Sequence, residues 1–106
     1  DGQRYLSKET CQLFTTEISK ISRRGLGFDK PDADDPKKGN CAPAAPAEVY
    51  GHTGFTGTCA WVDPMNELVY VFLSNRIYPD VTNRKLNQLH IRERIQGAIY
   101  DAMKKK

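Results

Sequence analysis

The second half of the chain shows two different spacings of apolar residues. Leu68–Leu73 is a run of six apolar or aromatic residues, which is typical of a short β-strand. Because both of its alternating faces would be apolar, we expect both to be buried, as in the middle of a sheet. From about Asn83 to Met103 the pattern changes to one of mostly three- and four-residue steps, through Leu86, Leu89, Ile91, Ile95, Ile99 and Met103. This predicts one amphipathic helix of about 20 residues that packs on the sheet.

The first half of the chain is less regular. Ser7 is a good N-cap for a helix that we expect to end near Thr15 or Thr16. Ile18–Phe28 contains a short strand candidate, in which glycines alternate with apolar residues. Asp29–Glu48 holds four of the six prolines and reads as a long irregular loop. Loops of this length are either functional or mobile surface excursions, and the sequence favours neither.

The middle of the chain is predicted to form a β-hairpin. We expect Gly51–Val62 to form its first strand, Asp63–Glu67 its turn and Leu68–Leu73 its second strand. The fold class is therefore α+β. It would have an antiparallel sheet of about three strands with the C-terminal helix on one face, where the first helix could join it.

The start of this hairpin is unusually rich in small residues. Tyr50–Thr58 reads YGHTGFTGT, with three glycines and three threonines among nine residues. Glycine weakens a strand and often marks a place where backbone or ligand approaches closely. The segment is therefore either a ligand-binding strand or a glycine-rich hairpin edge that binds nothing.

Composition limits the partners. With 106 residues the chain forms at most one domain. Its net charge of +3, from 16 basic and 13 acidic residues, is too mild to indicate a nucleic-acid-binding protein. No signal peptide and no transmembrane run is visible. The sequence starts without methionine, so we expect it to be an internal piece of a longer protein.

The candidate reactive side chains are few. Cys11, Cys41 and Cys59 form no Cys-x-x-Cys motif, although a Cys41–Cys59 disulfide is possible. His52 and His90 lack the neighbours that a metal site needs, and we expect neither a metal nor a cofactor. His52 could donate a hydrogen bond to a substrate carboxylate or carbonyl, or could be a structural histidine. No serine lies in a Gly-x-Ser-x-Gly or Ser-x-x-Lys motif, and no Tyr-x-Asn is present.

Several segments together resemble a known superfamily. Tyr50–Thr58, followed by Trp61-Val62-Asp63-Pro64 and by Leu68–Asn75, resembles the C-terminal end of serine beta-lactamases and penicillin-binding-protein-like hydrolases. Leu6–Thr10 and Gly25–Phe28 match segments that precede this motif. The likeness is greatest to the branch of class C beta-lactamases, D-alanyl-D-alanine carboxypeptidases and esterases, where His-Thr-Gly often replaces Lys-Thr-Gly. A narrower similarity is to a module fused to family 3 glycoside hydrolases in Bacteroidetes.

The resemblance implies roles for four residues. His52 would help hold a substrate carboxylate and tune the proton network, and Thr53 would offer its hydroxyl to the same carboxylate. Gly54 would keep the wall of the active site low. Phe55 would supply half of the oxyanion hole through its backbone N–H.

The resemblance also implies what is missing. The Ser-x-x-Lys nucleophile motif and the Tyr-x-Asn motif of such enzymes lie upstream, and both are absent here. Residues 1–106 would then be the C-terminal portion of a periplasmic or secreted serine hydrolase that acts through an acyl-enzyme. Its partners would be the upstream part of its own polypeptide and a small-molecule or peptidoglycan-peptide substrate.

Two alternatives stay open, namely a free-standing binding module and a degenerate, inactive homologue. Separation of such a sheet from its upstream strands would expose strand edges and apolar surface, so we expect the isolated chain to dimerise or to stay bound to the rest of its protein.

Overall fold

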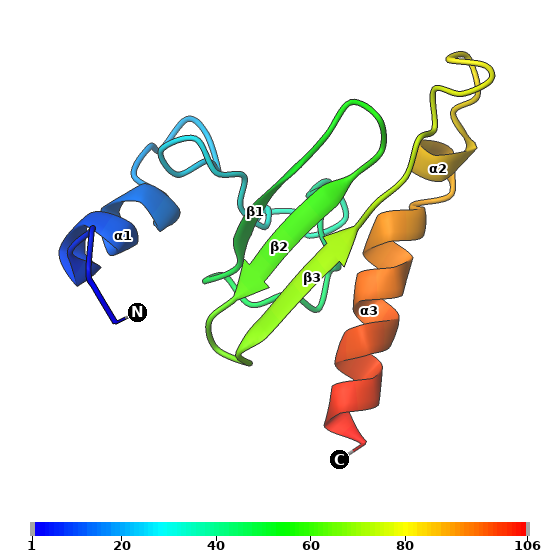
Figure 1. The fold of residues 1–106 in the computed structure, drawn as a ribbon. Coiled ribbons are helices and arrows are strands. Elements are labelled where there is room, and N and C mark those ends of the chain that lie inside the picture. The colour runs from blue at the N-terminus through cyan, green and yellow to red at the C-terminus, as the bar shows by residue number, and fades with distance from the viewer. Residues whose placement is uncertain (1, 106) are drawn as a thin grey trace.

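The computed structural model describes residues 2–105 as one small sheet with helices beside it (Figure 1). The strands are antiparallel and lie in the order β1-β2-β3. The α+β fold class and the three-stranded antiparallel sheet are thus confirmed. The elements are α1 (Lys8–Thr15), β1 (Tyr50–Thr53), β2 (Cys59–Asp63), β3 (Leu68–Phe72), α2 (Lys85–Gln88) and α3 (Ile91–Lys104).

Two hairpins stand where one was expected. The prediction of a single strand over Gly51–Val62 was wrong, because a tight turn separates β1 from β2. In this turn the Gly54 N–H donates to the Thr58 carbonyl at 2.8 Å, and the Gly57 N–H donates to the Gly54 carbonyl at 3.0 Å. Gly57 has φ +94°, a conformation that side chains disfavour. Gly54 and Gly57, which the sequence placed inside a strand, therefore form the turn that ends β1.

β3 is at the edge of the sheet and is buried on one face only. Tyr70 is buried, whereas Val69 and Val71 on the opposite face are 65% and 55% exposed. The expectation that both faces are buried was therefore wrong for this chain. The reason is that α3 covers one face, while nothing in residues 2–105 covers the other.

The core lies between the covered face and α3. It consists of Cys41, Val49, Cys59, Trp61 and Tyr70, against which Ala45, Phe72 and Ile99 pack. Tyr100 of α3 donates its hydroxyl to Asp63 Oδ2 at 2.8 Å, and Tyr70 donates to the Arg92 carbonyl at 3.1 Å. Two ends of the helix are thereby fixed to the sheet.

The long loop contributes to this core although it forms no helix or strand. The Ala42 N–H donates to Oε1 of the buried Gln96 of α3 at 2.8 Å. Cys41 comes from the loop and Cys59 from β2, and both are free thiols, so the possible disulfide between them is not formed. The loop is thus a packed part of the fold rather than a surface excursion along its whole length.

The C-terminal helix is divided in two. The prediction of one continuous helix was wrong, because His90 has φ 49° and ψ 44° and separates α2 from α3. The apolar positions Leu89 and Ile91 continue on both sides of His90. An apolar pattern of this kind gives no sign of a single left-handed residue.

The N-terminal segment is only partly as predicted. Ser7 caps α1 by accepting a hydrogen bond from the Thr10 N–H at 3.0 Å, and the helix ends at Thr15 as expected. However, α1 has no buried residue and lies apart from the sheet, so it covers neither face (Figure 1).

The strand expected within Ile18–Phe28 is not formed. Instead the Gly25 N–H donates to the Phe28 carbonyl at 3.1 Å around Gly27, which has φ +88°. Only the following residue, Asp29, pairs with β1, through an isolated bridge to Gly51. A turn therefore replaces most of the predicted strand.

Candidate functional site

β1 presents its residues alternately to the two faces of the sheet. Gly51 pairs with Trp61 across the strands, and a Cβ added to Gly51 would lie 2.6 Å from the Trp61 ring. A Cβ added to Gly54 would lie 2.2 Å from the Thr58 hydroxyl. Both glycines thus have a packing reason within the chain. Their density alone does not indicate a ligand.

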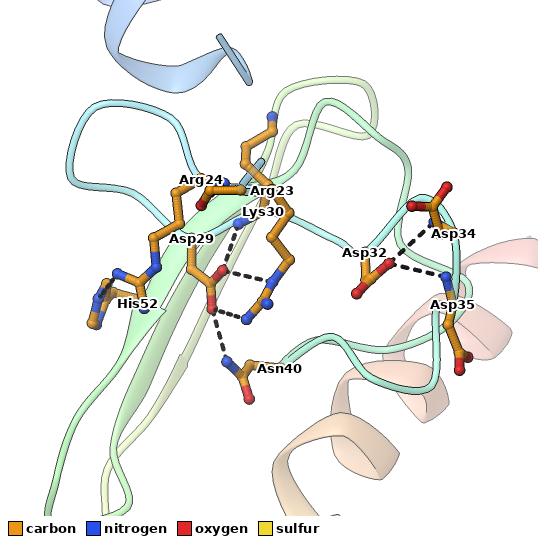
Figure 2. A network of polar contacts seen from close by, with 10 residues as sticks. Arg23, Arg24, Asp29, Lys30, Asp32, Asp34, Asp35, Asn40 and His52 are labelled. Atoms are coloured by element: carbon orange, nitrogen blue, oxygen red, sulfur yellow. Dashed lines mark hydrogen bonds and ion pairs between the residues drawn. The ribbon is translucent and has the colours of Figure 1, made fainter. Parts of the chain in front are cut away.

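His52 lies on the uncovered face and contacts two neighbours. Its Nδ1 is 2.7 Å from the Thr53 carbonyl oxygen, and its Nε2 is 3.2 Å from Nη1 of Arg24. Figure 2 shows Arg24 extending from the loop toward His52. The imidazole is exposed, but both of its nitrogens have partners within the chain.

The other three predicted site residues lie together. Thr53, Gly54 and Phe55 line a pocket of about 520 Å³ that His52 does not line. The same pocket is lined by Lys37, Lys38, Gly39, Asn40, Arg76, Asn87, His90, Arg92 and Glu93. Its basic side chains outnumber its single carboxylate, so an anionic group is the ligand class that its charges favour.

Phe55 is an exposed part of the lining of this pocket. Its side chain is 70% exposed, and the Arg76 guanidinium carbon lies 4.9 Å from the centre of its ring. This is a cation–π distance. Arg76 follows β3 and meets Phe55 only because the strands pair, so no local sequence pattern predicts this contact.

A buried carboxylate fixes the edge of β1. Asp29 lies 2.9 Å from Arg23 Nε and accepts from Arg23 Nη2 at 3.1 Å and from Asn40 Nδ2 at 2.8 Å (Figure 2). Burial alone would raise the pKa of Asp29, but the hydrogen bonds from Asn40 and Arg23 outweigh it and hold this pKa below its usual value. Asp29 also exchanges two backbone hydrogen bonds with Gly51, at 2.7 and 3.1 Å. The loop is thereby joined to the candidate strand.

The sequence model of the beta-lactamase family matches residues 4–93. The chain belongs to the beta-lactamase family. This confirms the family resemblance, whereas the narrower link to a fusion with family 3 glycoside hydrolases is not shown.

The beta-lactamase-family chain is also similar to curated bacterial proteins. It is 33% identical over 79 residues to a protein of Escherichia coli (strain K12) and 46% identical over 79 residues to one of Salmonella paratyphi B. Each is named "Putative D-alanyl-D-alanine carboxypeptidase", and each match covers 74% of this chain but 18% of the relative. The chain therefore spans less than a fifth of these relatives. No solved structure matches it.

In this beta-lactamase-family chain, α3 contacts the turn that follows β1. Arg92 is 7% exposed and donates to the carbonyls of Gly57 and Thr58 at 3.3 and 3.5 Å. Its other terminal nitrogen donates to Asn87 Oδ1 at 3.0 Å. The turn that follows the His-Thr-Gly strand is therefore held by a helix more than 30 residues away in sequence.

Two further properties concern residues 2–105 as a whole. They contain no group of three or more His, Cys, Asp or Glu side chains placed to hold a metal ion. None of the helices described there combines the length and the apolar character that crossing a membrane requires.

Proposed function

We propose that this chain forms the substrate-binding wall of a serine hydrolase that works through an acyl-enzyme intermediate. The observation that carries the proposal is that Thr53, Gly54 and Phe55 line one pocket with a basic surround, in a chain of the beta-lactamase family. Beta-lactams, D-alanyl peptides and esters are the substrate classes proposed. The names of the relatives support the D-alanyl peptides.

Each residue has a proposed part in this chemistry. His52 and Thr53 would help to bind the carboxylate of the substrate, and Gly54 would let the substrate lie close to the strand. The Phe55 N–H would donate to the oxyanion that develops during acyl transfer. Such a donor lowers the barrier by about 3 kcal/mol. The exposed Phe55 side chain would shape the entrance.

The chain alone would not turn over substrate. We propose that its partner is the upstream part of its own polypeptide, which would supply the serine, lysine and tyrosine that residues 1–106 lack in motif form. The uncovered apolar face of the sheet, with Val69 and Val71 exposed, supports such a partner. A peptidoglycan-derived substrate would place the enzyme in the periplasm or outside the cell.

Covalent labelling of the full-length protein tests this proposal. We expect intact mass spectrometry to show one adduct with a fluorophosphonate and one with a penicillin, both on a serine upstream of this chain. Thr53→Val should slow labelling by penicillin about tenfold, because a hydrogen bond to a carboxylate is lost. Thr56→Val, in the turn that follows β1, serves as the matched control and should label normally.

Two results would overturn the proposal. A folded protein that labels with neither reagent would be a binding module or a degenerate homologue. Equal labelling of the Thr53→Val and wild-type proteins would mean that this strand does not bind the substrate carboxylate.

A further inference from the structure

The turn that follows β1 is held by hydrogen bonds to its carbonyl groups. The Thr56 carbonyl accepts from the Arg76 N–H at 2.9 Å and from Ser74 Oγ at 3.1 Å. Both donors belong to the segment that follows β3. Within residues 2–105, by contrast, the Phe55 N–H donates to no carbonyl and to no side chain. The turn is therefore fixed around an N–H group that remains available to a ligand.

Arg92 of α3 contacts the other half of this turn. Its Nη1 donates to the Gly57 and Thr58 carbonyls at 3.3 and 3.5 Å, so one guanidinium nitrogen bridges two neighbouring peptide groups. The Thr58 carbonyl also accepts from the Gly54 N–H at 2.8 Å, and Gly54 immediately precedes Phe55. One hydrogen bond and one residue therefore separate the carbonyl that Arg92 contacts from the Phe55 N–H.

The buried charge of Arg92 is balanced by dipoles rather than by a carboxylate. Its side chain is largely buried, and within the described residues it forms no ion pair. Burial of a charge without a counter-ion is unfavourable unless polar groups contact it. Here the turn carbonyls and Asn87 Oδ1, at 3.0 Å, do so, although Nε has no partner in residues 2–105. The Arg92 carbonyl accepts from the Tyr70 hydroxyl at 3.1 Å, so its backbone is anchored as well.

We propose that Arg92 is a positioning residue for acyl transfer, which fixes the direction of the Phe55 N–H by holding the carbonyls of the turn. The inference rests on the proposed function for the reaction, and on the hydrogen bonds alone for the support of the turn. A preorganised donor is effective because it needs no rearrangement as charge develops on the oxyanion. Arginine suits this task better than lysine, because its planar fork contacts the turn and Asn87 at the same time.

Hydrogen exchange in the full-length protein labelled with ¹⁵N-glycine tests the support of the turn. The Gly54 and Gly57 N–H groups are both hydrogen-bonded within the turn, so their exchange reports its opening. Arg92→Lys should speed both exchange rates about tenfold. Tyr100→Phe is the matched control, because it removes a buried hydrogen bond from the same helix to the sheet but none to the turn. It should leave these two rates unchanged, and equal rates in Arg92→Lys and the wild type would overturn the proposal.

Kinetics with a phenyl ester and its thionoester, in which sulfur replaces the carbonyl oxygen, test the effect on catalysis. Sulfur is larger and accepts hydrogen bonds poorly, so a well-placed N–H favours the oxygen ester. Arg92→Lys should lower kcat for the oxygen ester about tenfold with KM nearly unchanged, and should lower the ratio of the two kcat/KM values. Tyr100→Phe should keep the wild-type ratio, because a general loss of stability affects both esters equally. An unchanged ratio in Arg92→Lys would overturn the assignment.

A second variant keeps the test decisive if Arg92→Lys does not fold. Asn87→Ala removes one partner of the guanidinium and leaves its charge in place, so it should change glycine exchange and the ester ratio in the same direction but by less. A wild type that forms no acyl-enzyme, with faster glycine exchange in Arg92→Lys, would refute the proposed function and leave the support of the turn intact. Acyl-enzyme formation with an unchanged ester ratio would instead refute the role of Arg92 alone.

Discussion

Both faces of the sheet carry apolar residues, but only one face is buried. On one face Trp61 and Tyr70 pair across β2 and β3 and are buried beneath α3. On the other, Ala60 and Val71 pair in the same way and are exposed. Apolar side chains on a strand favour burial, but they do not show which part of a protein covers them. In this chain the covered face forms the hydrophobic core, and His52 lies on the uncovered face.

The largest effect should come from the covered face. Trp61→Ala removes a side chain that is 1% exposed and leaves a cavity at the centre of the core. We expect the free energy of unfolding to fall by about 4 kcal/mol, enough to unfold a small domain at room temperature. Val71→Ala on the other face should cost less than about 1 kcal/mol. Urea titration followed by circular dichroism compares the two, and equal losses would remove the distinction between the faces.

A smaller effect should come from the edge where β1 meets the loop. Asp29→Asn leaves the Arg23 guanidinium without its ion pair, and we expect a loss of about 2 kcal/mol because Arg23 is 30% exposed and partly solvated. Asp34→Asn, an exposed carboxylate of the same loop, is the control.

The pH dependence of stability follows from the same carboxylate. The pKa of Asp29 is lower in the folded chain than in the unfolded one, so its contribution is present above the unfolded-state value of about 4 and is lost as the pH falls below it. Denaturation measured between pH 7 and pH 3 should therefore show a steeper decline for the wild type than for Asp29→Asn. Parallel curves would contradict this account.

A still smaller change in stability, but a clear change in association, should come from the uncovered face. We expect the isolated chain to dimerise or to stay bound to the rest of its protein. Replacing Val69 and Val71 by serine should weaken self-association in analytical ultracentrifugation with little effect on unfolding, and Met65→Ser in the β2–β3 turn is the control. A stable, monodisperse wild-type monomer would contradict the expectation.

The reactivity of the three thiols should distinguish the buried core from the exposed surface without any change in stability. Burial raises the pKa of Cys41 to about 12, and it also raises that of Cys59, whereas Cys11 is exposed. A disulfide reagent at pH 8 should therefore modify one thiol in the folded chain and three after unfolding. Rapid modification of all three in the folded chain would show that the covered face is open.

The sequence predicted what depends on neighbouring residues. The Ser7 cap needs only a hydroxyl and a free amide one turn away, and the run at Leu68–Phe72 needs only its own apolar residues. The His-Thr-Gly segment also gave the family from its local pattern. These features carry their causes within a few positions.

The features that sequence reasoning missed depend on distant contacts. Arg76 meets Phe55, and Arg24 meets His52, only after the chain has folded. The end of β1 was missed for a different reason, since the glycines of its turn were read as glycines of a strand. Burial of one face of β3 could not be deduced, because apolar positions do not reveal where the covering helix lies.

The bond from Arg92 to the turn after β1 has a consequence for synthesis on the ribosome. Gly57 is translated 35 residues before Arg92, so the His-Thr-Gly segment leaves the ribosome well before the side chain that supports it. At about 5–20 residues per second the delay lasts a few seconds. A nascent chain stalled while Arg92 is still inside the exit tunnel and Gly54–Thr58 have left it would display the motif without its support. Limited proteolysis of such stalled chains should cut within Gly54–Thr58, where the finished protein resists.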